Sequence, residues 1–292
     1  MNDSIPNGKI IVGVDRTRQS LDAARFAMRE AYRTKQSLVL IHGYLVGAVA
    51  YQWHVTDLEQ FGHDAHAMLA LARDVLHEEF GDAIEIDIKA LPQQANIALI
   101  DASKDATLAV VGRRDDSWAE HLLTGSVSSS LAAQASCPVV VVPSADGDPA
   151  RTDGSHVVVA VDAQVSADDA LGFAFESASV RRSSLRVLHV VPTGESWIPP
   201  KQQERAIAEA LARWVNKYPN VPVDTRVAEG DVAAVCAEAS TSASLLVVAR
   251  PHTKHVGGWT RSVARDVLRA AKAPVAVVPR SVTVDANPRS SS

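Results

Sequence analysis

One stretch of the sequence has residue types that suit the binding of an anion. Gly112 closes an apolar run, and Gly125 with Ser126 comes directly before a helical pattern that includes Val127 and Ser128. The free amide groups and the dipole of a helix N-terminus can hold a phosphate, and serine hydroxyls add further donors. The spacing predicts a phosphate site at this helix start, although a Gly-Ser pair before a helix is also an ordinary N-cap.

The chain contains the same pattern twice. The apolar run IIVGVD ends at Asp15 and VVVAVD ends at Asp162, which lies 147 residues later. The next apolar runs place His42 and His189 at the same separation. A constant separation through two elements predicts a tandem repeat. The two histidines therefore favour a role in the shared scaffold, such as a hydrogen bond at the strand end.

Apolar runs alternate with helical patterns within each copy. The runs are rich in Val and Ile and are apolar at successive positions, which indicates strands that are buried on both faces. Ala-rich stretches such as LDAARFAMREAYR and ADDALGFAFESASVRR favour helices between them. We predict an α/β fold made of two tandem copies of a doubly wound, five-stranded parallel sheet. Its ligand crevices should lie at the carboxyl ends of the strands.

Length and composition agree with two domains. A chain of 292 residues with 47% hydrophobic content can build two cores. The polar segment SADGDPARTDGS reads as a connection, and VDANPRSSS as a tail. We expect domains over residues 1–145 and 156–282, a linker over 146–155 and a disordered tail over 283–292.

Several classes of function are disfavoured. The formal net charge of -5 gives no electrostatic reason to expect binding to nucleic acid or to an anionic membrane. The N-terminus lacks a secretory signal pattern, and no stretch approaches the roughly 18 apolar residues of a membrane span, so we expect a cytoplasmic protein. The absence of GxGxxG, GxxxxGK[ST] and GxSxG motifs disfavours a dinucleotide dehydrogenase, a P-loop ATPase and an α/β-hydrolase.

Cysteines and histidines do not form a recognisable metal motif. Cys137 and Cys236 lie in different halves without CxxC spacing, and we interpret them as small buried apolar residues. His63 and His66, with Glu59 nearby, share a predicted helix. Scattered histidines on a polar helix face favour a solvated surface over a metal site.

The phosphate loop resembles that of universal stress proteins that bind ATP. This family carries G-x2-G-x9-G-[ST], an Asp at the end of the first strand and a CPV-type last strand. Gly112, Gly125 and Ser126 have that spacing, Asp15 closes the first run, and CPVVVVP follows the last predicted helix of the first copy. The resemblance covers both copies, from about residue 8 to 281, and implies the adenine nucleotide alpha-hydrolase-like fold.

The resemblance implies an ATP site in the first copy, with Mg²⁺ as an accompanying ion. Asp15 would lie near the adenine or ribose, and Gly43 falls at an adenine contact that its missing side chain would weaken. The implied site residues are Gly13, Asp15, Gly43, Gly112, Arg113, Gly125, Ser126, Val127 and Ser128. The alternative for Asp15 is a turn residue after a strand.

The sequence departs from the family pattern in both copies. Asp115 stands at the second glycine and is followed by Asp116, which places two carboxylates near a polyanion unless Arg113, Arg114 or a divalent ion offsets them. In the second copy the three glycines are replaced by Ala249, His252 and Arg261. We therefore expect the second copy to bind nucleotide weakly or not at all.

The resemblance implies an ATP-binding regulator or sensor, and no base–nucleophile pair in the sequence indicates an enzyme. Two alternatives stay open, which are a nucleotide-free, stress-induced interaction module and a slow ATP hydrolase. The expected partners are an adenine nucleotide and an unidentified regulatory protein. Family members pair through their last strands, so residues 139–142 and 275–278 are expected to pair within one chain or in a homodimer.

Overall fold

The computed structural model describes residues 8–44, 55–113, 126–144, 155–161, 167–193, 200–251 and 261–280. Nearly all of the predicted linker and the whole of the predicted tail lie outside these residues. The elements of the first copy are β1 (Lys9–Gly13), α1 (Arg18–Thr34), β2 (Ser37–Gly43), α2 (Val55–Phe80), β3 (Ile86–Leu91), α3 (Ala95–Ala102), the 3₁₀ helix η2 (Ser103–Asp105), β4 (Leu108–Gly112), α4 (Val127–Gln134) and β5 (Val139–Val142).

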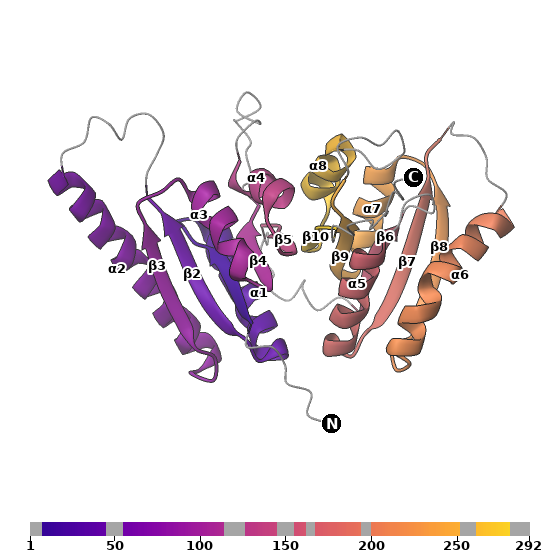
Figure 1. Cartoon of the computed structure of the whole chain (residues 1–292), viewed down its shortest axis with the longest axis horizontal. Helices are drawn as coiled ribbons and strands as arrows, with labels where there is room; N and C mark the ends of the chain where they lie inside the picture. The colour runs from indigo at the N-terminus through magenta and orange to yellow at the C-terminus, as the bar shows by residue number, and fades with distance from the viewer. Residues whose placement is uncertain are drawn as a thin grey trace, which may run out of the picture.

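The second copy repeats this order. Its elements are β6 (His156–Val161), α5 (Asp168–Arg181), β7 (Ser184–Val191), α6 (Pro200–Lys217), β8 (Val223–Glu229), α7 (Val232–Ser240), β9 (Ala243–Ala249), α8 (Arg261–Ala270) and β10 (Val275–Val278). The predicted α/β fold with two tandem copies is confirmed, with helices on both faces of the strands (Figure 1).

The two copies share one sheet. Its strand order is β3-β2-β1-β4-β5-β10-β9-β6-β7-β8, so the second half reads as the first half reversed. Neighbouring strands within each copy are parallel, whereas β5 and β10 are antiparallel, with Ala276 opposite Val140. The predicted pairing of residues 139–142 with 275–278 thus occurs within one chain. It gives both edge strands a partner, and Figure 1 shows the halves meeting there.

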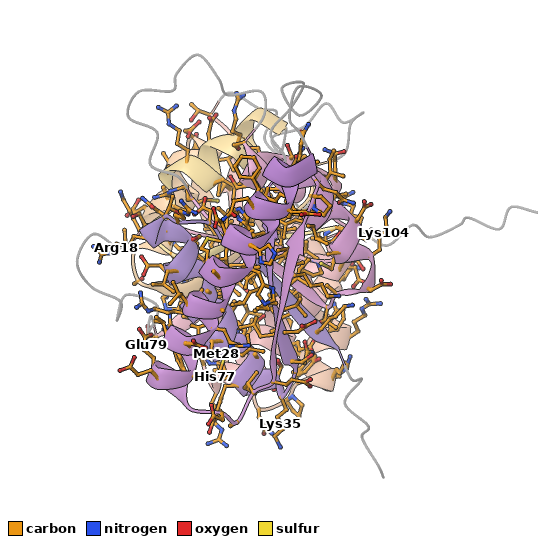
Figure 2. The ribbon with its side chains drawn as sticks, turned by 90° about the vertical axis from the view of Figure 1, so that its left-hand side faces the viewer. Arg18, Met28, Lys35, His77, Glu79 and Lys104 are labelled. Carbon is orange, nitrogen blue, oxygen red and sulfur yellow. The ribbon has the colours of Figure 1, made fainter. Side chains whose placement is uncertain are left out.

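The repeat extends to the ends of the first helices. α1 is followed by Lys35 and α5 by Arg182, and both residues are left-handed, with φ of 55° and 53°. In each case the backbone amide donates back to the last turn, which is the usual way to close a helix before a strand. Figure 2 shows Arg18 at the start of α1 and Lys35 at the lower end of the molecule. Because α1 follows β1 directly in the chain, it begins at the end of the sheet where the strands carry their carboxyl termini.

The hydrophobic core crosses the boundary between the copies. One cluster of buried side chains contains Phe26 and Val140 of the first copy together with Phe175 and Ala276 of the second. All four are at most 1% exposed. The strands β5 and β10 are covered on both faces, so separating the copies would expose apolar surface of each copy. The free-energy cost is about 25 cal/mol for each Å² of apolar surface exposed.

Both cysteines of the chain are buried, as the sequence predicts. Burial raises the pKa of the Cys137 thiol to about 11 and that of Cys236 to about 12. Because the thiolate is the reactive form, we expect neither thiol to react with a chromogenic disulfide reagent at neutral pH in the folded protein. Both should react once denaturant is added. Rapid labelling of the folded protein would contradict this expectation.

Candidate functional site

A pocket of about 310 Å³ lies in the first copy at the carboxyl ends of β1, β2 and β4. This is the edge at which a doubly wound sheet binds its ligands. Most of the predicted site residues line it, namely Gly13, Asp15, Gly43, Gly112, Ser126, Val127 and Ser128. Gly125 lies outside the described residues, as do Arg114, Asp115 and Asp116.

Three helices begin at this pocket. Thr17 caps α1, Ala95 starts α3 and Ser126 caps α4, and all three line the pocket wall. The N-terminal end of each helix carries partial positive charge and amide groups without an intrahelical acceptor. Their convergence makes the pocket suited to an anionic ligand.

The start of α4 serves both as an N-cap and as a set of donors. The Oγ of Ser126 accepts a hydrogen bond from the amide of Ser129 at 3.2 Å and lies 2.8 Å from the Ser129 Oγ. The cap interpretation of the Gly-Ser pair is therefore correct. The amides of Val127 and Ser128 belong to the first turn, so the helix itself provides no acceptor for them. Both residues line the pocket, so capping and anion binding are compatible here.

Asp15 lies in a turn and in the pocket wall at once. Its Oδ1 accepts hydrogen bonds from the amide of Thr17 at 2.8 Å and from the Thr17 hydroxyl. Ser20 closes the same turn, with its hydroxyl accepting from the Asp15 amide at 3.1 Å. The turn interpretation is therefore correct for the contacts of Oδ1. These contacts fix the carboxylate just after the carboxyl end of β1.

Glycines at the ends of β2 and β4 allow the backbone at the start of two helices to lie close to these strands. A Cβ on Gly43 would lie 2.6 Å from the carbonyl oxygen of Gln93 and 2.7 Å from the amide nitrogen of Ala95. A Cβ on Gly112 would lie 2.5 Å from the carbonyl oxygen of Gln19. Gly43 thus lets α3 begin against β2, and Gly112 lets the first turn of α1 lie against β4.

The second copy has larger residues at the matching strand positions. Val190 occupies the position in β7 that Gly43 occupies in β2, and Ala249 ends β9 as Gly112 ends β4. Ala160 takes the place of Gly13. The close approaches seen in the first copy cannot be repeated there without backbone movement.

The repeated histidines have the scaffold role that the sequence predicts. His42 Nδ1 lies 2.7 Å from the carbonyl oxygen of Val14, and His189 Nδ1 lies 3.0 Å from that of Val161. A carbonyl only accepts, so Nδ1 is the protonated nitrogen and Nε2 is an acceptor in the neutral ring. His42 also lines the pocket, which the sequence did not indicate.

Arg113 does not line the pocket. Its guanidinium donates to the carbonyl oxygens of Leu268 at 3.1 Å and Ala271 at 2.8 Å, at the end of α8 in the second copy. The interpretation of Arg113 as a cation beside the phosphates needs correction, because these contacts hold its side chain at the junction between the copies.

Sequence reasoning missed part of the pocket wall. The N-cap residue Thr17 lines it together with Gln19 and Ser20 of the first turn of α1, as do Ala95 and Leu99 of α3. Thr17 could have been found, because a threonine before an amphipathic helix is a common N-cap. The α3 residues carry no comparable signal, since an alanine and a leucine in a helix indicate only packing.

The described part of the chain shows neither a metal-binding cluster nor a membrane-spanning helix. In that part, no group of three or more His, Cys, Asp or Glu residues could hold a metal ion. Glu59, His63 and His66 are exposed on α2. No helix within the same ranges is long and apolar enough to cross a membrane.

A model of the universal stress protein family matches the chain twice, over residues 6–143 and 155–279. The chain belongs to the universal stress protein family. A universal stress protein of Mycolicibacterium smegmatis is 33% identical over 288 residues, which cover 92% of this chain and 96% of that relative. Universal stress protein Rv2623 of Mycobacterium tuberculosis is 32% identical over 302 residues, covering 94% and 97%.

A solved structure shows the same fold. A universal stress protein from Archaeoglobus fulgidus DSM 4304 matches with a TM-score of 0.74 and 16% identity, covering 95% of this chain and 98% of that one. The match spans both copies of this universal stress protein, so the tandem arrangement is shared at the level of the fold.

Proposed function

We propose that this universal stress protein binds ATP in its first copy and acts as a regulator or sensor rather than as an enzyme. The observation that carries the proposal is the pocket at the carboxyl ends of β1, β2 and β4, where three helices begin. Its volume of about 310 Å³ lies at the lower end of the range of small-molecule sites, which is roughly 300–1,000 Å³.

The residues of the pocket fit the parts of a nucleotide. Ser126, Val127 and Ser128 offer hydroxyl and amide donors to phosphate oxygens. Asp15, which also lines the pocket, offers a carboxylate to which ribose hydroxyls can donate. Mg²⁺ would supply positive charge between phosphate oxygens when bound with the nucleotide. Gly125 completes the proposed site on the strength of its spacing.

We also propose that the second copy binds nucleotide weakly or not at all. Val190 and Ala249 replace two of the pocket glycines, and Ala160 replaces the third. The remaining parts of the proposal are the domain division at 1–145 and 156–282 with its linker at 146–155, a cytoplasmic location, a role in the stress response and an unidentified regulatory protein partner. We also propose that the chain can form a homodimer.

The first test is the nucleotide content of freshly purified protein. We expect about one equivalent of ATP per chain in the supernatant of denatured protein on ion-exchange chromatography, because a single copy retains the site. Protein stripped of nucleotide should bind added ATP with Mg²⁺ in a titration calorimeter. A protein that is empty and also ignores added ATP would contradict the proposal and leave the nucleotide-free interaction module as the better explanation.

A further inference from the structure

An arginine of the second copy contacts the helix that starts at the pocket of the first. Arg250 follows β9, and its Nε donates to the carbonyl oxygen of Ala132 at 2.9 Å. Its Nη2 donates to the carbonyl oxygen of Ala135 at 2.7 Å. Both carbonyls lie at the C-terminal end of α4, whose N-terminal end lines the pocket. The contact joins residues more than a hundred positions apart in the chain.

The contact has a counterpart on the other side of the junction. Arg113 follows β4 as Arg250 follows β9, and it caps the end of α8 through Leu268 and Ala271. Figure 1 shows α4 and α8 facing one another above β5 and β10. Each copy thus supplies an arginine to the last carbonyls of the other copy's fourth helix. A cation at a helix C-terminus satisfies these acceptors and complements the dipole.

α4 depends on such contacts for its position. It runs only from Val127 to Gln134, and helices of this length are marginal without tertiary support. Leu131 and Ala132 are its buried residues, so one face packs on the sheet while the end is held by Arg250. Burial lowers the pKa of the Arg250 guanidinium, and the two carbonyls offset that loss of hydration.

We infer that Arg250 is a positioning residue for the nucleotide site, through which the second copy holds α4 in the orientation that binds phosphate. The inference rests on the proposed function of the first copy. It gives the second copy a role that does not require it to bind nucleotide itself. Arg250 does not line the pocket, so its effect must pass through α4.

The test compares two ligands in an Arg250→Met variant. Methionine keeps an unbranched side chain but provides no donor, so α4 loses its C-terminal contacts while the buried face remains. We expect the dissociation constant for ATP to rise about tenfold, because α4 is then no longer held in place before binding and ordering it on binding costs about 1.4 kcal/mol. Adenosine lacks phosphates, and its dissociation constant should stay within about twofold of the wild-type value.

A ligand-free measurement accompanies the titrations. Amide hydrogen exchange of Ser130 and Leu131 in α4 should be faster in Arg250→Met, whereas exchange in α1 should not change. The exchange rate of these α4 amides in Arg250→Lys should fall between those of the wild type and Arg250→Met, since lysine keeps the charge but not the two-pronged geometry of the donor.

Arg181→Met is the matched control. Arg181 also reaches across the junction, with its Nη2 2.7 Å from Glu30 Oε1, but it contacts α1 and not α4. We expect this variant to lower stability and to leave the ratio of ATP to adenosine affinity unchanged at a temperature where it is folded.

The possible outcomes separate the two proposals. A wild-type protein that binds neither ligand overturns the proposed function and this inference with it. A wild-type protein that binds both, together with an Arg250→Met variant of unchanged ATP affinity, overturns the inference alone. Equal weakening of ATP and adenosine would also overturn it, because Arg250 would then support the whole domain rather than the phosphate side.

Discussion

Replacing Glu30 by glutamine should lower the free energy of unfolding by about 3 kcal/mol, because it leaves a buried arginine without its counter-charge. Glu30 on α1 is 5% exposed, and its Oε1 lies 2.7 Å from Arg181 Nη2 of α5. The Arg181 side chain is 6% exposed. Arg33 also contacts Glu30, at 2.6 Å, but with 29% exposure it can turn to water. Chemical denaturation followed by far-UV circular dichroism measures the change.

Glu79→Gln is the control for this prediction. Glu79 pairs with Arg25 at 2.8 Å, also between two helices, but its side chain is 36% exposed and lies at the margin of the first copy (Figure 2). An exposed ion pair contributes at most about 1 kcal/mol. Equal losses in the two variants would contradict the burial of the Glu30–Arg181 pair.

A paired replacement tests the physical cause. Glu30→Leu combined with Arg181→Leu removes both charges, and buried ion pairs replaced by apolar residues are often neutral or stabilising. We expect the double variant to recover most of the stability lost in Glu30→Gln. The result would show that the pair adds little net stability to the fold, although removing one partner alone is costly.

The architecture could be predicted because it repeats. Asp15 and Asp162 are separated by the same distance as His42 and His189, and that constant separation indicates two copies without any knowledge of the fold. The apolar strands 139–142 and 275–278 were predicted to pair because an exposed edge of four valine-rich residues needs a partner. The antiparallel register of β5 and β10 confirms it.

The junction between the copies could not be predicted in the same way. Arg113 and Arg250 follow strands in a sequence context that suits a phosphate site as well as a helix cap. Their acceptors are backbone carbonyls 115 to 158 positions away, which no residue type marks. Glu30 likewise occupies a helix position where a solvated carboxylate would be ordinary. Side-chain direction at a long-range contact is a property of the packed fold and leaves no periodic signal.

The pocket was predicted in part for a related reason. The motif glycines and serines have a spacing that can be read directly, and most of them line one pocket. What Gly43 and Gly112 do there depends on the backbone of Gln93 and Gln19, which comes close only in the folded chain. The sequence therefore indicated where the site lies, and the structure adds why a side chain at these positions would disturb it.

A carboxylate in place of Ser128 should weaken ATP binding strongly without harming the fold. Ser128 lies in the first turn of α4 and lines the pocket. A negative charge in the first turn of a helix stabilises it by about 0.3–1 kcal/mol, so Ser128→Asp should unfold at or above the wild-type midpoint. The same charge would face the phosphates, and two unit charges about 4 Å apart near a protein surface repel by about 4 kcal/mol.

We therefore expect Ser128→Asp to raise the dissociation constant for ATP by about a hundredfold or more, which corresponds to about 2.7 kcal/mol. Adenosine should bind nearly as it does to the wild type. The loss for ATP should shrink as salt is added, since screening weakens repulsion between exposed charges. Isothermal titration at two ionic strengths measures the ATP affinity, the adenosine affinity and the effect of salt on ATP binding.

Ser129→Asp is the matched control, because Ser129 occupies the next position of the same turn but is exposed and does not line the pocket. It places the same charge on the same helix end, so its benefit to helix stability is similar, yet it should change the ATP affinity only a few-fold. If both variants bind ATP like the wild type, the phosphates do not lie at α4 and the site assignment fails. If both lose it equally, net charge near the pocket decides binding, and the geometry of the first turn does not.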